Sequence, residues 1–363
     1  MILMNIMQMI DNLNIGGSER MAVNISNVLV KNGNHIVLCT SREKGALTEF
    51  VDKGVKLECL NKKKAWDVIA FRRFLNIIKS NQVELIHAHS SSVFWAAAAK
   101  MFYPNVKLIW HDHLGDEGKL NSERKKGVQR ISGKIDGIIA VSEKLKIWSQ
   151  LYTKVKDENV VYIPNFPLLK EPETQKDNSD KKLKIVCLGN LRWQKGHSDL
   201  LKAISIIEKK SLDLDYKLII AGGFEKDEYY LELQKIINEN QLEEKVEFSG
   251  SVTDTSELLY NCDIGVLSSV TEGLPVSLLE YGLASLPVVV TDVGQCAEVV
   301  DHGKAGLVVP SENPEAFANA LTELLKNEEM RKKLAQKFKY RTETVYGSKN
   351  FLKHYNLLIS EIQ

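Results

Sequence analysis

Residues 184–189, KIVCLG, form a short apolar run that ends in a glycine, and this run decides the fold class. Two runs of the same kind follow it, LIIAG at 218–222 and PVVVT at 287–291. A strand that is apolar at consecutive positions has both faces buried, which is typical of a parallel sheet covered by helices on each side. The sequence therefore predicts an α/β fold in which helices wind both faces of a parallel sheet.

The same alternation of short β-branched runs and longer helical patterns extends in both directions from this stretch. The strands expected before it are residues 5–10, 35–40, 56–60, 85–89, 107–111, 137–141 and 160–164. The strands expected from it onward are residues 184–189, 217–222, 246–250, 263–267, 287–291 and 306–309.

A polar segment, KEPETQKDNSDKK at 170–182, separates the two sets of strands and contains no large apolar residue. Such a segment cannot fill a core, so we interpret it as a linker. The sequence then predicts a Rossmann-like domain over 1–169 and a second one over 183–345. Residues 346–363 form an amphipathic C-terminal helix, for which packing back on the first domain is one expectation. Ligands of such sheets bind at the carboxyl ends of the strands, so we expect a site where two of these edges face each other.

The composition excludes several classes of protein. The 48 Lys and Arg residues nearly cancel the 47 Asp and Glu residues, giving a formal net charge of +1, so nothing indicates a nucleic-acid partner. A membrane-spanning helix needs about 18 consecutive apolar residues, and no apolar run in the sequence is that long. The five cysteines include no Cys-x-x-Cys pair, which argues against a disulfide framework or a zinc ribbon. We expect a cytoplasmic protein.

A glycine pair follows the first expected strand, in NIGGSER at 14–20. Gly16 and Gly17 would let a ligand approach the backbone closely, and the helix that starts here would offer free N–H groups to an anion. A plain tight turn is the alternative interpretation.

Two histidine pairs end neighbouring strands, His87 with His89 and His111 with His113. Alternate residues of a strand share a face, so each pair could in principle bind a metal ion. No Cys or Glu at ligand spacing completes such a site, so we expect no metal and interpret the rings as hydrogen-bonding groups.

A basic loop, GNLRWQKGH at 189–197, follows the strand KIVCLG and precedes a helix. Arg192 and Lys195 there suit a phosphate group, because cations and a helix start both favour an anion. A surface loop with two solvated charges is the alternative.

The segment TEGLPVSLLEYGLA at 271–284 carries two glutamates with seven residues between them. Pro275 is expected in the first turn of a helix that is apolar almost all round, and Glu280 is the only charge in it. A buried carboxylate without partners costs several kcal/mol, so Glu280 must bind a polar group. Glu272 precedes the helix, and the two acids would flank a helix start that attracts a phosphorylated ligand. A stray salt bridge would explain one of these glutamates but not both.

This E-x7-E pattern, followed by GLASLPVVVTDVG, resembles the signature of the retaining glycosyltransferases of family 4. NIGGSER, IHAHS, WHDH, AVSE, YIPN and GLVVPSENPEAFANAL also resemble segments of that family, in the same order. The resemblance covers essentially the whole chain. It implies the GT-B fold, in which two Rossmann-like doubly wound domains face each other across a cleft, the first binding the acceptor and the second the nucleotide sugar.

The resemblance also implies roles for single residues of the second domain. Glu280 would bind the ribose hydroxyls of the donor nucleotide and Glu272 the hydroxyls of the transferred sugar. The N–H groups of Gly273 and Leu274 would hold the donor diphosphate together with Lys195.

On the first domain, the resemblance implies that His111 lies beside the reacting centre and that Gly16 and Gly17 allow the donor phosphate to approach. One departure concerns the diphosphate. The family usually has Arg directly after the strand-ending glycine, where this chain has Asn190, so either Arg192 or a larger share for Lys195 would compensate.

The implied reaction transfers a hexosyl or N-acetylhexosaminyl group, with retention and without a metal, from a nucleotide-diphosphate sugar to a glycan or lipid-linked acceptor. The donor is expected to be UDP-linked, no cofactor is expected, and surface polysaccharide or glycoconjugate synthesis is the expected setting. A nucleotide-sugar epimerase, a non-catalytic nucleotide-sugar-binding subunit and a metal hydrolase built on the histidine pairs are the alternatives.

Two basic stretches suggest contact with an anionic membrane surface. The first combines basic residues at 62–64, 72 and 73 with Trp66 and Phe71, and the second is residues 119–134. Solvated helix faces are the alternative, but a peripheral association on the inner face of the membrane is our hypothesis.

Overall fold

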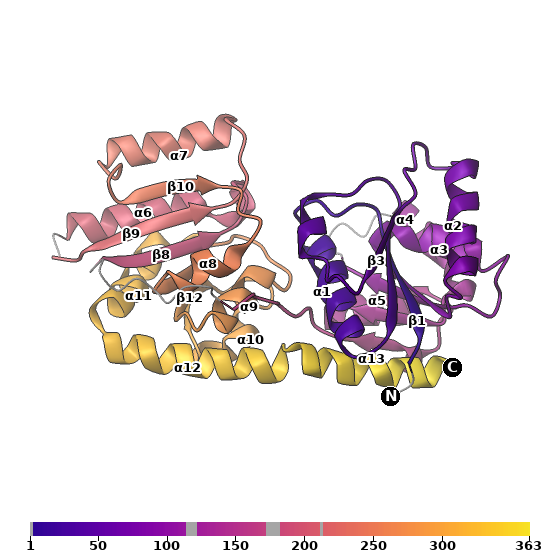
Figure 1. Ribbon diagram of the computed structural model, residues 1–363. Helices are drawn as coiled ribbons and strands as arrows, with labels where there is room; N and C mark the ends of the chain where they lie inside the picture. The colour runs from indigo at the N-terminus through magenta and orange to yellow at the C-terminus, as the bar shows by residue number, and fades with distance from the viewer. Residues whose placement is uncertain (1–2, 114–121, 172–181, 211–212) are drawn as a thin grey trace. The chain divides into compact units, whose positions relative to one another are not determined.

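The strands expected from the sequence are present in the computed structural model, where they form two parallel sheets (Figure 1). The structure describes residues 3–113, 122–171, 182–210 and 213–363. They divide into two units, which we describe one at a time. Unit 1 is Met1–Phe166 with Ser348–Gln363, and unit 2 is Pro167–Gly347. The expected doubly wound α/β fold is confirmed in both units.

Unit 1 contains a seven-stranded sheet in the order β3-β2-β1-β4-β5-β6-β7. Its strands are β1 (Asn5–Ile10), β2 (His35–Thr40), β3 (Lys56–Cys59), β4 (Leu85–His89), β5 (Lys107–Asp112), β6 (Gly137–Ala140) and β7 (Val160–Tyr162). Its α-helices are α1 (Gly17–Lys31), α2 (Val68–Ser80), α3 (Val93–Ala99), α4 (Ser122–Ile131), α5 (Glu143–Tyr152) and α13 (Ser348–Ile362). The strand order reverses between β1 and β4, which is where doubly wound sheets usually bind ligands.

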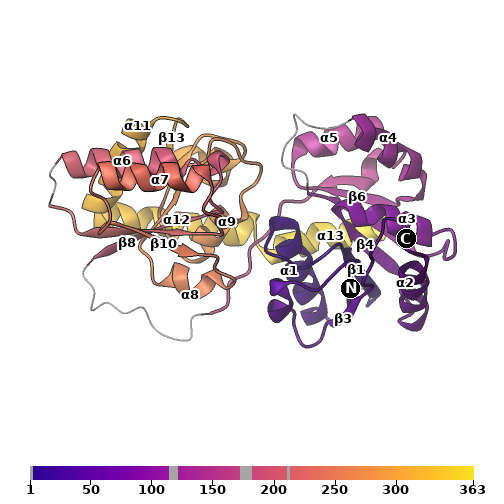
Figure 2. The ribbon, with the colours of Figure 1, turned by 90° about the horizontal axis from the view of Figure 1, so that it is seen from above.

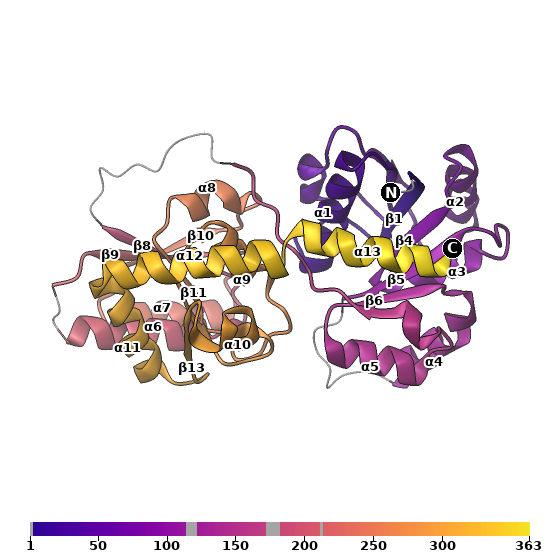
Figure 3. The same cartoon turned by 90° about the horizontal axis from the view of Figure 1, so that it is seen from below.

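The C-terminal helix α13 lies along one face of the unit 1 sheet (Figure 3). The centroid of its Phe351 ring lies 4.8 Å from that of the Phe166 ring, and the centroid of its Tyr355 ring lies 5.4 Å from that of His87 in β4. Leu358 contacts Gly137 at the start of β6, where a Cβ atom would lie only 3.1 Å from the leucine side chain. The apolar side of α13 is therefore buried within unit 1.

Unit 2 contains a six-stranded sheet in the order β10-β9-β8-β11-β12-β13. Its strands are β8 (Leu183–Leu188), β9 (Tyr216–Ala221), β10 (Val246–Gly250), β11 (Ile264–Leu267), β12 (Val288–Thr291) and β13 (Leu307–Val309). Its α-helices are α6 (His197–Lys209), α7 (Glu228–Glu239), α8 (Thr255–Tyr260), α9 (Val276–Leu283), α10 (Cys296–Val299), α11 (Pro314–Lys326) and α12 (Glu328–Val345). The order reverses between β8 and β11.

The apolar run of β8 is divided between the two faces of the unit 2 sheet. Ile185 and Cys187 belong to the core that α6, α7 and α11 cover, whereas Val186 and Leu188 belong to the core beneath α8, α9 and α12. Figure 2 shows α6, α7 and α11 together on one side of the sheet. A run that is apolar at every position is thus buried on both faces, as the sequence predicts.

The boundary between the units precedes the expected linker. The backbone N–H of Lys170 donates to Ser256 Oγ at 3.0 Å, and Lys170 Nζ lies 2.8 Å from Asp254 Oδ2, so this residue is tied to unit 2. Most of the linker expected at 170–182 lies outside the described residues. No α-helix among the described residues has the length and apolar character needed to cross a bilayer.

Candidate active site

Glu272 and Lys195, two residues expected at the site, meet where the strand order of the unit 2 sheet reverses. Lys195 follows β8 and Glu272 follows β11, its neighbour in the sheet. Lys195 Nζ lies 2.6 Å from Glu272 Oε1, and the two side chains keep 28% and 10% of their surface exposed. Ser269 Oγ donates to the same Oε1 at 2.6 Å. The two residues therefore form one charged, hydrogen-bonded pair that solvent still reaches.

Helix α9 begins directly after this pair with no side-chain cap. Proline occupies the N-cap at Pro275 rather than the expected first turn, with φ −74° and ψ 116°, and it has no side-chain oxygen that could accept from the helix N–H groups. Among the described residues, the N–H groups of Gly273, Leu274 and Val276 donate no hydrogen bond. Free N–H groups at a helix start favour an anion, and the helix dipole adds to that preference.

α9 shares this lack of a cap with some helices of the chain and not with others. Side chains cap other helix starts, for example Ser142 at α5, Asp227 at α7 and Asn313 at α11. No side chain caps α1, α3, α6, α9 or α10, which follow β1, β4, β8, β11 and β12. These strands include the pair at each switch point, β1 with β4 and β8 with β11, so uncapped helix starts occur at both candidate edges.

The loop of Lys195 and the loop of Glu272 are held together by close backbone contacts. Gly196 has φ +64°, and a Cβ atom there would lie 2.0 Å from the Ser268 carbonyl oxygen, so only glycine fits. Ser268 Oγ donates to the Lys195 carbonyl at 3.0 Å, and the N–H of Val270 donates to the Gln194 carbonyl at 2.8 Å. Lys195 and Glu272 are thus positioned by the backbone as well as by each other.

Glu280 lies in α9 beside Leu279 and Tyr281, and only 8% of its surface is exposed. Tyr281 anchors the helix to the sheet, because its hydroxyl accepts from the Leu188 N–H at 2.6 Å and donates to the Val266 carbonyl at 3.3 Å. The second glutamate of the E-x7-E pattern is therefore a buried carboxylate on a rigid element, as expected.

Arg192 and Asn190 differ in what they contact. Arg192 is exposed, and no ion pair or hydrogen bond of its side chain occurs among the described residues. Asn190 Oδ1 accepts from the Gly223 N–H at 2.8 Å and so joins the loops that follow β8 and β9. The asparagine has a structural contact of its own, and Lys195 is the cation that the fold places beside Glu272.

The charge of Lys195 also acts on His197, the first residue of α6. Burial and, second, the Lys195 ammonium lower the pKa of His197 to about 4. This ring is therefore neutral at physiological pH and adds no positive charge to the site.

In unit 1, Gly16 is the N-cap of α1 and Gly17 its first residue. The Glu19 side chain contacts Gly16, and Ser18 Oγ donates to Glu19 Oε2 at 2.8 Å. No atom lies within 4 Å of the position a Gly17 Cβ would take. A carboxylate therefore lies where the sequence places a donor phosphate, and this flexible side chain would have to move.

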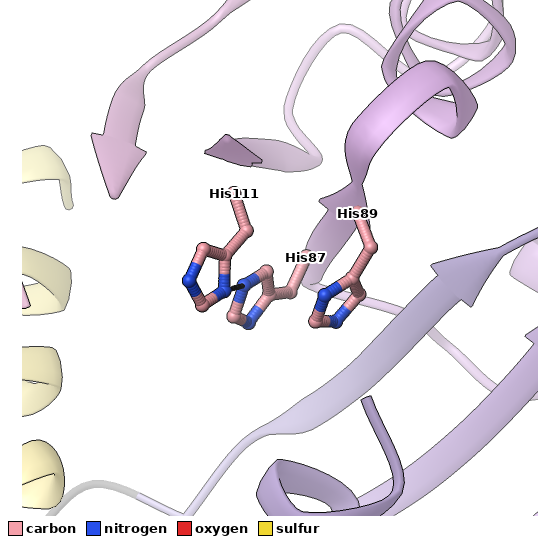
Figure 4. A group of neighbouring side chains, drawn as sticks. All are labelled: His87, His89 and His111. Atoms are coloured by element: carbon pink, nitrogen blue, oxygen red, sulfur yellow. Dashed lines mark hydrogen bonds between the residues drawn. The ribbon is translucent and has the colours of Figure 1, made fainter. Parts of the chain in front are cut away.

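Two histidines of β4, His111 of β5 and His113 directly after β5 form a closed cluster in unit 1. His87 Nε2 lies 3.1 Å from His111 Nδ1, and His89 Nδ1 lies 2.8 Å from His113 Nε2. The first pair stacks on the second, with centroids 4.6 Å apart for His87 and His89 and 3.9 Å apart for His111 and His113. Figure 4 shows the two rings from β4 beside His111 from β5.

Burial makes these rings neutral. It lowers the pKa of His87 and of His113 to about 3, and it lowers the pKa of His89 and of His111 well below the ordinary value. His111, expected beside the reacting centre, has no exposed surface and packs near Phe351 of α13. Contact between His111 and a ligand would require the cluster to open.

The cluster also has the kind of donor atoms that bind a metal ion. His87, His89 and His111 each offer a nitrogen, and these atoms lie within 4.8 Å of one another. Nitrogens around tetrahedral zinc would be about 3.3 Å apart and would point at a shared centre. In the structure, the pairs point at each other in hydrogen bonds, and His89 Nε2 lies 2.8 Å from Gln8 Oε1. The arrangement suits a hydrogen-bonded network better than a metal centre.

Sequence reasoning missed two parts of these sites. Ser269 holds Glu272, and its signal is a pair of serines at a strand end three residues before the glutamate. Gln8 joins the histidine cluster, and its signal is one polar residue inside the apolar strand NIMQMI.

Comparison with known proteins gives a consistent result along the chain. Residues 15–166 match the model described as Glycosyltransferase Family 4, and residues 170–341 match the model described as Glycosyl transferases group 1. The chain is 25% identical over 354 residues to the amylovoran biosynthesis glycosyltransferase AmsD of Erwinia amylovora, with 96% of this chain and 97% of AmsD covered.

A second relative and a solved structure are also similar. The N,N'-diacetylbacillosaminyl-diphospho-undecaprenol alpha-1,3-N-acetylgalactosaminyltransferase of Campylobacter jejuni is 29% identical over 159 residues, 44% of this chain and 40% of that enzyme. The fold matches Anabaena HepE, solved in complex with UDP, with a TM-score of 0.79 at 17% identity over 99% of this chain and 100% of HepE.

Proposed function

The chain belongs to the group 1 and family 4 glycosyltransferases, and from this premise we propose which reaction it catalyses and with which residues. The enzyme transfers a hexosyl or N-acetylhexosaminyl group from a UDP-linked donor, with retention at the anomeric carbon, to a glycan or lipid-linked acceptor. The observation that carries this proposal is the Lys195–Glu272 pair beside the uncapped start of α9.

The chemistry of sugar transfer explains why such a pair is useful. The nucleotide diphosphate leaves with added negative charge, while the sugar becomes oxocarbenium-like. Lys195 and the N–H groups of Gly273 and Leu274 stabilise the leaving phosphate, because fixed donors aimed at developing charge lower the barrier. Since Lys195 is bound to Glu272, the diphosphate has to exchange with that carboxylate, which then becomes available to the sugar hydroxyls.

Glu280 binds the ribose hydroxyls. Its carboxylate is buried at a fixed position on α9, and hydrogen bonds accepted from two hydroxyl groups would offset the free energy lost by burying its charge. Arg192, which is exposed and unpaired among the described residues, supplements Lys195 at the diphosphate. Gly16, Gly17 and His111 serve the reacting centre only after Glu19 moves and the histidine cluster opens.

The relatives support the choice of substrates. The Campylobacter jejuni enzyme is named for an undecaprenyl-diphosphate acceptor, AmsD for amylovoran biosynthesis, and HepE was solved with UDP. We extend these to a UDP donor and a glycan or lipid-linked acceptor in polysaccharide or glycoconjugate synthesis. The named activities favour transfer over a nucleotide-sugar epimerase or a non-catalytic binding subunit.

We also propose that the reaction needs no metal and no cofactor, because Lys195 and the helix start already supply the positive potential that a metal would add. Activity that survives EDTA supports this proposal. Activity that EDTA abolishes and zinc restores would assign a metal to the histidine cluster instead.

A peripheral membrane contact is proposed for the N-terminal end of α2. Trp66, Val68 and Ile69 are 85%, 65% and 67% exposed, and Lys63, Lys64 and Arg72 beside them are exposed as well. We call these six residues the α2 surface. Exposed aromatic and aliphatic groups ringed by cations suit an anionic bilayer on the cytoplasmic side.

Other residues expected in this membrane contact lie elsewhere. Lys62 lies 3.3 Å from Asp11 and is largely buried, and Phe71 packs 5.5 Å from the Trp95 ring. Part of the second basic stretch, 119–134, lies outside the described residues.

The proposed reaction is tested with a panel of UDP-sugars and undecaprenyl-diphosphate-linked or glycan acceptors. Product mass identifies the sugar, and NMR coupling at the anomeric proton identifies retention or inversion. Glu272→Gln should abolish most transfer, whereas Glu232→Gln on α7 should not. Equal transfer by both variants would remove Glu272 from the site.

A further inference from the structure

We propose that Ser269 is a positioning residue, which holds Glu272 in place when Lys195 moves to the donor diphosphate. This inference rests on the proposed function, because it assigns a second group to the same site. Ser269 Oγ and Lys195 Nζ both lie 2.6 Å from Glu272 Oε1, while no hydrogen bond to Oε2 occurs among the described residues. The carboxylate is therefore held by one oxygen and leaves the other for a ligand.

The serine is itself rigidly placed. Its side chain is fully buried, and its carbonyl accepts from Thr291 Oγ1 at 2.6 Å. The next residue, Val270, donates its N–H to the Gln194 carbonyl at 2.8 Å. Ser269 lies between β11 and the loop of Glu272, so its backbone is held from β12 on one side and from the Lys195 loop on the other.

The need for a second holder follows from the chemistry of donor binding. A diphosphate competes for Lys195, and this competition removes one of the two donors on Oε1. The Ser269 hydroxyl has a single proton, and its acceptor is the Glu272 carboxylate. With Ser269 still donating, Glu272 keeps its rotamer and presents Oε2 to a sugar hydroxyl. Without it, a carboxylate that no longer contacts Lys195 is free to turn.

The test compares Ser269→Ala with Ser205→Ala. Ser205 is a matched control, because it is a largely buried serine of unit 2 whose Oγ also makes a 2.6 Å side-chain contact, to Asn240 Oδ1. Hydrogen bonds to charged groups are strong enough that we expect Ser269→Ala to lower kcat/KM for the best UDP-sugar about 10- to 100-fold. Ser205→Ala should stay within about two-fold of the wild type.

Two further readouts separate positioning from a general structural role. UDP without a sugar does not need Glu272, so the Kd for UDP should change by less than about two-fold in Ser269→Ala. In a Glu272→Gln background, Ser269→Ala should lower kcat/KM by less than about a further two-fold, because both changes act through the same carboxylate. Where Ser269→Ala fails to fold, Ser269→Cys keeps the volume with a weak donor and is read in the same way.

The measurements distinguish failure of the Ser269 role from failure of the whole site. The positioning role is overturned if Ser269→Ala lowers kcat/KM no more than Ser205→Ala does, or if it weakens UDP binding as much as it lowers turnover. It is also overturned if the losses from Ser269→Ala and Glu272→Gln are fully additive. If Glu272→Gln alone leaves transfer unchanged, the proposed site fails and the inference fails with it.

Discussion

The two sheets of this protein are wound in the same way, but the polar groups at their carboxyl edges are in opposite states. In unit 2, Lys195 and Glu272 are charged partners that solvent still reaches. In unit 1, four histidines at the ends of β4 and β5 are neutral, hydrogen-bonded and packed beneath α13. The topology gathers polar side chains at both edges, and burial decides whether they carry charge.

The difference indicates how the work is divided between the units. A site that stabilises a departing diphosphate needs fixed positive charge, which the unit 2 edge has in Lys195 and in the N–H groups before α9 that donate to no described residue. The histidine cluster has no charge to offer, and it joins β4, β5 and β1 through the Gln8 contact. We expect the unit 2 edge to bind the donor diphosphate, and the closed histidine cluster of unit 1 to contribute mainly to stability.

A fall in pH should therefore lower the free energy of unfolding by favouring protonation of the histidine cluster in unit 1. The pKa of His87 and of His113 is about 3 when folded, against 6.5 as the reference for a free ring. Stability is then complete above pH 6.5 and is lost as the pH falls toward 3, because the unfolded chain binds more protons. Between pH 7 and pH 5 the loss is about 2 kcal/mol for each such ring. Urea unfolding across this range measures it.

A substitution sharpens the acid experiment. His113→Phe removes one of the titrating rings, so the pH slope of the unfolding free energy should fall by about 1.4 kcal/mol per pH unit. His35→Gln, on an exposed side chain, is the control. A slope that both variants leave unchanged would show that the cluster is not the source of acid sensitivity.

Removing the charge from the unit 2 edge should have the next largest effect. Lys195→Ala should lower turnover of a UDP-sugar about 100- to 1,000-fold, equivalent to about 2.7–4 kcal/mol of barrier, because one donor to the leaving phosphate is lost. Lys202→Ala, whose ammonium lies 3.1 Å from Asp199 on the same unit, is the control. UDP release measures both, and equal rates would remove Lys195 from catalysis.

The backbone contact between the two unit 2 loops should have a smaller effect. Gly196→Ala forces a Cβ atom against the Ser268 carbonyl at a residue with φ +64°, which should cost about 1–3 kcal/mol of stability and separate Lys195 from Glu272. Gly133→Ala in unit 1, where no atom lies within 4 Å of the new Cβ, is the matched control. Thermal unfolding and UDP release are the measurements. A variant that matches the control would contradict the fixed-loop account.

The α2 surface should give the smallest effect per residue. Each basic residue near an anionic membrane contributes about 1 kcal/mol, so Lys63→Gln with Lys64→Gln should weaken vesicle binding about 30-fold. Lys333→Gln with Lys337→Gln on α12 is the control pair. Co-sedimentation with phosphatidylglycerol vesicles at low salt decides, and binding unchanged by the first pair would reject this surface.

Much of the fold could be predicted because a strand buried on both faces leaves an uninterrupted apolar run, as in β8 and β12. The E-x7-E pattern also singled out Glu272 and Glu280, and in the structure Glu272 precedes α9 and Glu280 lies within it. The Lys195–Glu272 contact could not be predicted from spacing, since 77 residues separate the two and only the order of β8 and β11 brings them together.

The histidines show a different limit. Alternation along a strand puts His87 and His89 on one face, but it does not show which rings of the next strand they meet. In the structure, the register pairs His89 with His111, and α13 covers the rings from far along the chain. Their burial, and with it their loss of charge, follows from this packing, which no local pattern contains.

Binding of a nucleoside diphosphate at the unit 2 sheet edge underlies every role proposed above, and isothermal titration calorimetry with UDP measures it. The full chain should bind UDP, and Glu280→Gln and Lys195→Ala should each weaken this binding at least about 10-fold, because each removes a charge-assisted contact. His113→Phe should bind UDP as the wild type does. If neither unit 2 variant changes the affinity for UDP, the nucleotide does not bind at this edge.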